Sequence, residues 1–126
     1  LCNETTIAYV QCTDEKDEHY QELDKMEKEL AAFRRLDGEP YNLIPLPMAE
    51  PVYEDDYRLP ATYANFLIMN NVVLMPTYDT HKDSIAKEQL QKAFPNREII
   101  GIDCRTLIKQ HGSLHCITMQ YPEGFL

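Results

Sequence analysis

The sequence has little or none of several features that mark particular classes of protein. Its 126 residues contain no apolar run near the roughly 20 residues of a membrane-spanning helix, so no membrane partner is expected. Lys and Arg number 12 against 21 Asp and Glu, which gives a formal net charge of -9. Because nucleic-acid binding normally needs clustered basic residues, no nucleic-acid partner is expected either. The acidic balance suits a cationic small molecule better.

Zinc-type cysteine spacings are also absent, because no two of Cys2, Cys12, Cys104 and Cys116 are close in sequence. His111 and His115 form one His-x3-His pair, but the intervening Gly112 argues against a shared helical face. We therefore expect no metal site and free thiols in a reducing, cytoplasmic environment. The chain opens without the basic segment of a signal peptide and without an initiator Met, as a fragment or a processed chain would.

The hydrophobic pattern predicts an α/β fold. One helix has an apolar stripe at spacings of three and four, and a second covers Thr80–Phe94 and ends at Pro95. The first stripe is Tyr20, Leu23, Met26, Leu30 and Phe33, and the second buried face is Ile85, Ala86, Leu90, Ala93 and Phe94. The predicted strands are Thr6–Cys12, Tyr41–Leu46, Ala64–Met69, Val72–Met75, Arg97–Ile102 and Leu114–Met119. Residues 47–60 read as a loop, Asn70-Asn71 as a hairpin turn because Asn tolerates positive φ, and Thr106–Gln110 as one helical turn.

The order strand, polar turn, helix, strand occurs twice, over residues 6–46 and 72–102. In this alignment Ile7 matches Val73 and Asp17 matches Asp83. Repeat architectures need about three units or more for stability, so we expect further units before Leu1.

Cys116 is the main candidate for chemistry. From its position in a β-type run, a buried core thiol is the ordinary interpretation. Two details favour a reactive thiol, namely an irregular backbone allowed by Gly112-Ser113 and the adjacent His115. Neighbours on a strand point to opposite faces, so we expect His115 not to activate Cys116 directly. A nucleophilic thiol needs a lowered pKa or a nearby base.

Asn65 and Gly112 are secondary candidates for lining a site. Asn65 is a polar residue within an apolar segment, where it either braces the floor of a site or faces water. The acidic runs Asp14–Glu18 and Glu54–Asp56 are predicted to be solvated, although the second could meet a cationic substrate. His19, His81 and His111 are predicted to lie at the surface.

Four segments stand out in this order along the chain: Leu59–Ile68, Val73–Pro76, Phe94–Ile102 and Gly112–Gln120. In sequence and order they resemble the agmatine deiminases. The last contains His-Cys-Ile-Thr, whose Cys is the catalytic nucleophile in that family, and this role carries over onto Cys116. The family usually has a run of glycines followed by Asn-Ile before this motif, whereas this chain has Gln110-His111-Gly112-Ser113-Leu114.

The resemblance implies a pentein fold, an α/β-propeller of five pseudo-symmetric ββαβ modules. Residues 1–126 would then be the C-terminal portion of one catalytic domain, holding about two modules. It also implies hydrolysis of agmatine to N-carbamoylputrescine and ammonia, a step of putrescine and polyamine biosynthesis, through an amidino-thioether on the Cys. A His acts as general acid and base, carboxylates bind the guanidinium, and no metal or organic cofactor takes part. The family's His-x-Asp motif is expected before Leu1, so this portion alone would be inactive and would need its N-terminal partner. A homodimer is compatible with the resemblance.

Two alternatives remain open. One is a deiminase of free or peptidyl arginine, which an Arg placed to bind the substrate carboxylate would favour. The other is a non-catalytic fragment whose exposed edge pairs with another chain.

Overall fold

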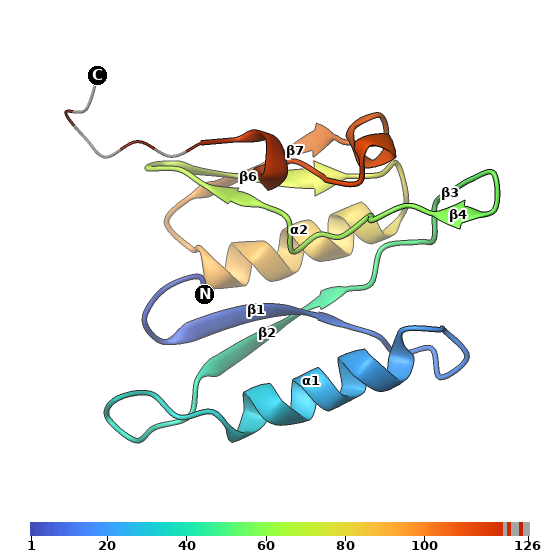
Figure 1. Cartoon of the computed structure of the whole chain (residues 1–126). Coiled ribbons are helices and arrows are strands. Elements are labelled where there is room, and N and C mark those ends of the chain that lie inside the picture. The colour runs from blue at the N-terminus through green and yellow to red at the C-terminus, as the bar shows by residue number, and fades with distance from the viewer. Residues whose placement is uncertain (120, 122–123, 125–126) are drawn as a thin grey trace.

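Two strand–helix–strand units follow one another in a mixed α/β arrangement (Figure 1). The computed structural model describes residues 1–119, 121 and 124. The first unit is β1 (Thr6–Gln11), α1 (Tyr20–Ala32) and β2 (Asn42–Pro47); the second is β6 (Val72–Thr77), α2 (Lys82–Ala93) and β7 (Glu98–Asp103). In each unit the two strands are parallel and paired over their full length, from Thr6↔Asn42 and from Val72↔Glu98. The predicted repeat is confirmed, because the aligned Ile7 and Val73 are both the second residue of their strand.

The second unit has an additional strand, β5 (Leu67–Ile68), which pairs antiparallel with β6. The Met69 N–H donates to the Val72 carbonyl at 2.9 Å and closes the predicted hairpin. The Asn70-Asn71 turn does not use the positive φ that Asn tolerates. Among the described non-glycine residues, only Asp55, Asp79 and His111 have a positive φ.

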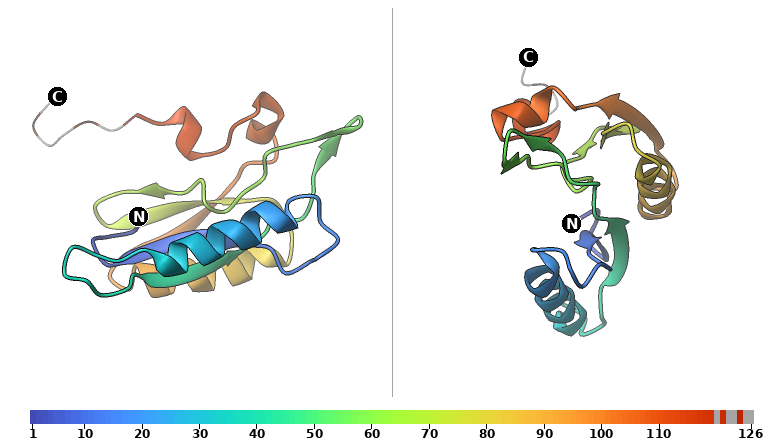
Figure 2. Two further views of the ribbon diagram at one scale, coloured as in Figure 1. Left: turned by 60° about the horizontal axis from the view of Figure 1, so that its bottom comes forward. Right: turned by 90° about the vertical axis from the view of Figure 1, so that its right-hand side faces the viewer.

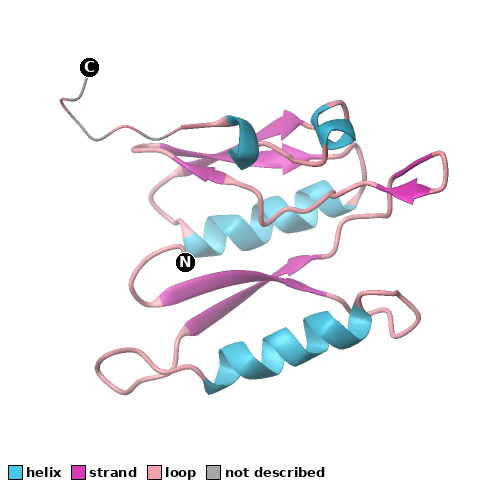
Figure 3. Cartoon of the chain, viewed as in Figure 1, coloured by secondary structure: helices cyan, strands magenta, loops and turns pink. Residues whose placement is uncertain are grey.

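Helix α2 lies between the two sheets and packs on both (Figures 1 and 3). Its buried residues Ala86, Leu90 and Ala93 join one hydrophobic core with Leu46 of β2 and Met75 of β6. The predicted buried face is confirmed except for Ile85, which is 45% exposed. Ile85 borders an open groove that is also lined by Leu46 and Pro47 of β2 and by the following Met48.

Helix α1 covers the outer side of the β1–β2 sheet (Figure 2). Its predicted stripe faces the sheet but is only half-buried, and none of the helix residues is fully buried. Phe33, predicted in the stripe, is 52% exposed because the backbone is already extended at this C-cap residue. The described part of the chain contains no helix that is long and apolar enough to cross a membrane.

Two further segments differ from the prediction. The 47–60 loop contains a short antiparallel hairpin, β3 (Tyr53–Glu54) with β4 (Tyr57–Arg58), that projects from the fold (Figure 1). The predicted strand Leu114–Met119 is wrong, because this segment forms a 3-10 turn, η2 (His115–Ile117). Its backbone bonds locally, with the Thr118 N–H donating to the His115 carbonyl, rather than to a neighbouring strand. The preceding turn η1 (Leu107–Gln110) agrees with the helical turn predicted there.

Candidate active site

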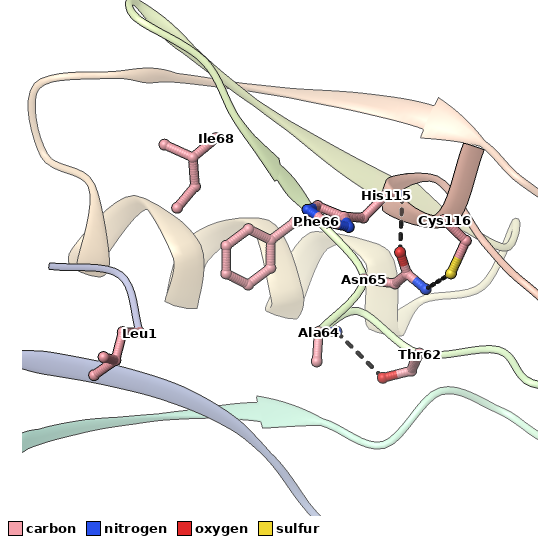
Figure 4. Close-up of a pocket in the computed structure, with 8 residues that line it drawn as sticks. All are labelled: Leu1, Thr62, Ala64, Asn65, Phe66, Ile68, His115 and Cys116. Atoms are coloured by element: carbon pink, nitrogen blue, oxygen red, sulfur yellow. Dashed lines mark hydrogen bonds between the residues drawn. The ribbon is translucent and has the colours of Figure 1, made fainter. Parts of the chain in front are cut away.

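Cys116 is an exposed thiol on η2, and Asn65, in the loop before β5, holds it from the side (Figure 4). The Asn65 Oδ1 accepts the His115 backbone N–H at 2.7 Å, and the Asn65 backbone carbonyl accepts the same N–H at 3.3 Å. Since this N–H can only donate, the amide oxygen must face it. The Asn65 Nδ2 is thereby turned toward Cys116 Sγ, to which it donates at 3.1 Å.

The same contacts favour the charged form of the Cys116 thiol. The Asn65 amide, followed by the Ser113 backbone, lowers the pKa of Cys116 below its ordinary value, and the small effect of desolvation opposes them. Hydrogen bonds to a thiolate stabilise it relative to the thiol. A larger fraction of Cys116 is therefore available as a nucleophile near neutral pH than of an ordinary cysteine.

Gly112 lies directly against the same side chain. A Cβ placed on Gly112 would lie 3.1 Å from Cys116 Cβ and 3.5 Å from its Sγ. The first distance is tighter than ordinary contacts, so a side chain here would push Cys116 away. Glycine at position 112 thus leaves the Cys116 side chain where it is, whereas a Cβ there would require Cys116 to shift.

An open pocket of about 460 Å³ adjoins Cys116 (Figure 4). Its polar side is formed by Asn65, His115 and Cys116. The rest of the lining is mainly apolar and consists of Leu1, Thr62, Ala64, Phe66 and Ile68. The pocket therefore offers one reactive sulfur beside a wall suited to an aliphatic chain.

The structure thus brings together Cys116, Asn65 and Gly112, the three candidate residues of the sequence analysis. His115 also lines the pocket, although its ring and the Cys116 thiol leave the turn in opposite directions (Figure 4). The sequence analysis expected the His115 and Cys116 side chains to diverge because it assumed a strand, which is absent. The 3-10 turn directs the two side chains apart as well.

The other candidates lie outside the pocket. Glu54–Asp56 are exposed at the tip of the β3–β4 hairpin, as predicted. His111 is exposed, with a left-handed backbone, and its ring packs edge-on against Tyr57 at 5.2 Å. His19 and His81 are exposed as predicted. The prediction of a fully solvated acidic run is wrong at Asp17, whose side chain is 12% exposed and pairs with Arg58 at 3.2 Å.

Two buried residues that support this site were not singled out from the sequence. Ser113 is fully buried directly before the Cys116 turn, and its hydroxyl lies 2.9 Å from the Tyr78 hydroxyl. Ser113 carried little signal in the sequence, because it stands in the polar segment Gln110-His111-Gly112-Ser113. Among the described residues, no group of three or more His, Cys, Asp or Glu side chains is arranged to hold a metal ion.

Comparisons with known proteins agree on the family to which the chain is similar. The model of the family described as Porphyromonas-type peptidyl-arginine deiminase matches residues 1–122. A protein of Marinomonas sp. (strain MWYL1), provisionally named agmatine deiminase, is 37% identical over 134 aligned residues. That alignment covers 93% of this chain and 36% of the relative.

Solved structures agree in fold over nearly the whole chain. A Porphyromonas gingivalis protein provisionally described as an arginine deiminase has a TM-score of 0.97 at 60% identity, over 100% of this chain and 37% of that one. A cysteine-to-serine variant of C. jejuni agmatine deiminase with substrate bound has a TM-score of 0.83 at 43% identity. The match covers 91% of this chain and 33% of the C. jejuni chain. The chain spans about a third of the length of these relatives. On the family match and these identities, the chain belongs to the Porphyromonas-type peptidyl-arginine deiminase family.

Proposed function

We propose that this chain supplies the nucleophile, Cys116, of an enzyme that hydrolyses agmatine to N-carbamoylputrescine and ammonia. The single observation that carries the proposal is the exposed Cys116 thiol with its lowered pKa, held by Asn65 at the mouth of an open pocket. Relatives named agmatine deiminase support the substrate.

The reaction begins when the Cys116 thiolate attacks the guanidinium carbon of agmatine and forms a C–S bond. The resulting tetrahedral adduct expels ammonia after one nitrogen takes up a proton, and an amidino-thioether remains on Cys116. Water then adds to the same carbon and loses its protons, and the C–S bond breaks to release N-carbamoylputrescine and the thiolate. Overall, one water is consumed and one ammonia is released for each guanidine.

Within this chain, Asn65 has two tasks. Its amide N–H stabilises the thiolate before attack and again when the sulfur leaves the second adduct. Its carbonyl oxygen keeps the η2 turn in place through the His115 backbone N–H. The apolar wall of Ala64, Phe66 and Ile68 faces the butyl chain of agmatine. The proton-transferring His and the guanidinium-binding carboxylates belong to the part of the enzyme before Leu1.

The remaining elements of the proposal concern the whole enzyme. The two units are modules of a pentein α/β-propeller, and residues 1–126 are the C-terminal portion of its single catalytic domain. This portion is inactive without the N-terminal portion. The enzyme works in the cytoplasm in putrescine and polyamine biosynthesis, and it could assemble as a homodimer.

Substitution of the nucleophile tests the proposal directly. Cys116→Ser in the complete enzyme should abolish ammonia release from agmatine while leaving the thermal unfolding transition in place. The matched control is Cys12→Ser, because Cys12 is a buried thiol directly after β1 and lies outside the pocket lining. Turnover retained by Cys116→Ser would refute the assignment.

The second candidate function is deimination of free or peptidyl arginine, which the family description and the P. gingivalis relative favour. The two substrates differ at the carboxylate, which free arginine has and agmatine lacks, so an Arg of the complete enzyme placed to bind that carboxylate would favour this alternative. Rates measured with agmatine, arginine and a capped arginine amide would separate the substrates. A preference for free arginine would contradict the agmatine proposal and leave the role of Cys116 intact.

A further inference from the structure

The two groups that hold the Cys116 sulfur come from different segments of the chain. The Asn65 amide belongs to the loop before β5, and the Ser113 backbone belongs to the loop before η2. For both to support one sulfur, these two loops must keep a fixed separation. A contact that joins the loops directly would set that separation.

The hydroxyl of Tyr78, a residue just after β6, makes this connection. It donates to the Thr62 carbonyl at 2.9 Å and accepts the Thr62 backbone N–H at 3.1 Å. Its oxygen also lies 2.9 Å from the Ser113 hydroxyl. Because the single Tyr78 proton is used by the Thr62 carbonyl, which can only accept, the Ser113 hydroxyl must donate to Tyr78.

Each partner of Tyr78 leads to one support of the sulfur. The Thr62 carbonyl also accepts the Asn65 N–H at 3.4 Å, so Tyr78 and Asn65 share this anchor. Ser113 is held through its side chain while its backbone faces Cys116. Tyr78 is 3% exposed and Ser113 is fully buried, so water does not replace these bonds.

We propose that Tyr78 is a positioning residue: its buried hydroxyl holds the Asn65 loop and the Cys116 turn at the separation that places Asn65 and Ser113 against the sulfur. Tyr78 does not touch the pocket and acts only through its two partners. The inference deepens the proposed function, since it assigns a support to the same nucleophile.

Tyr63 provides a matched control. It is a second buried tyrosine, and its ring is 5.5 Å from that of Tyr78. Its hydroxyl, however, donates to Asp83 at 2.7 Å and lies 3.3 Å from the Thr80 hydroxyl, so it contacts the start of α2 and not the Cys116 turn. The Tyr63 hydroxyl ties the Asn65 loop to α2, whereas the Tyr78 hydroxyl joins that loop to the Cys116 turn, so only loss of the Tyr78 hydroxyl breaks the connection between the two loops.

The test measures the alkylation rate of Cys116 by iodoacetamide over a range of pH, with the modified peptide quantified by mass spectrometry. In Tyr78→Phe the rate at neutral pH should fall by roughly threefold to tenfold, and the profile should move to higher pH, because weakly held donors stabilise the thiolate less. Tyr63→Phe should lose stability but keep the parental profile. Superimposable profiles of Tyr78→Phe and the parent would overturn the proposal.

Ser113→Ala covers the case in which Tyr78→Phe does not fold. It removes one bond and keeps the phenol and its two bonds to Thr62, and its profile should move in the same direction by a smaller amount. An unchanged profile there would overturn the proposal equally. Since alkylation needs no turnover, failure of the parent enzyme to release ammonia from agmatine would reject the proposed function alone.

Discussion

Asp17 and Asp83 occupy matching positions in the two units, but the structure predicts very different costs when each is replaced by alanine. Asp83 accepts three hydrogen bonds, from the Tyr63 hydroxyl at 2.7 Å, the Tyr78 N–H at 3.1 Å and the Thr80 N–H at 3.2 Å. It therefore ties a buried tyrosine and the chain after β6 to the first turn of α2. Asp83→Ala leaves the buried Tyr63 hydroxyl with only the Thr80 hydroxyl.

A hydrogen bond to a charged group contributes about 1.5–3 kcal/mol, and the three bonds at Asp83 are not independent, so we expect a loss of about 3 kcal/mol. Asp17 also accepts three hydrogen bonds, from the His19 N–H at 2.9 Å and from two Arg58 nitrogens at 3.2 and 3.3 Å, but Arg58 keeps Glu18 at 3.0 Å when Asp17 is removed. For Asp17→Ala we expect about 1 kcal/mol, the typical value for a local cap and a partly exposed ion pair.

Thermal unfolding of the parent and the two variants, followed by circular dichroism at one protein concentration, measures this difference. For 126 residues that unfold as one unit, about 1 kcal/mol lowers the Tm by roughly 4 °C, so the expected decreases for this portion are roughly 12 °C and roughly 4 °C. Asp83→Asn, which keeps one acceptor oxygen, should fall between the parent and Asp83→Ala. An equal or larger decrease for Asp17→Ala would refute the assignment of the stronger network to the second unit.

Three further predictions concern the thiol site. Iodoacetamide should modify Cys116 first and Cys104 last, because burial raises the pKa of Cys104 whereas hydrogen bonds lower the pKa of Cys116. Peptide mapping over time checks this order, and faster labelling of Cys104 would contradict it. Asn65→Asp should slow alkylation of Cys116 at pH 7 by roughly tenfold, since a carboxylate at 3.1 Å disfavours the thiolate, and Asn65→Ala should be affected less. Gly112→Ala should reduce kcat by roughly tenfold by displacing the sulfur, with Gly38→Ala, which is strained by its positive φ of 85° but lies away from the pocket, as a control for loss of stability.

Much of the fold follows from local patterns in the sequence. The β1–α1–β2 and β6–α2–β7 units were predictable because strands rich in β-formers and amphipathic helices alternate, and such units pair in parallel. The exposure of Ile85 was not predictable, because helical periodicity gives a face but not which of its residues border an open groove. The β3–β4 hairpin was missed because it has only two residues per strand.

The site was predictable at Cys116, Asn65 and Gly112 but not in its geometry. The sequence Leu114–Met119 has β-type composition, yet no neighbouring strand bonds to it, and Asn65 captures the His115 N–H instead. That contact joins residues 50 positions apart. Tyr78 and Ser113 escaped notice for the same reason, since a hydrogen bond across 35 positions leaves no periodic signal.

The shallow packing of helix α1 on its sheet determines how easily the helix opens. A helix without a fully buried residue opens at a low free-energy cost, so its amide hydrogens should exchange well before those of α2, which buries residues against two sheets. We expect the segment after α1 to tolerate an insertion as well, because Leu36 in this segment is fully exposed. A fluorophore or affinity tag placed there would report on the molecule while leaving the surroundings of Cys116 undisturbed.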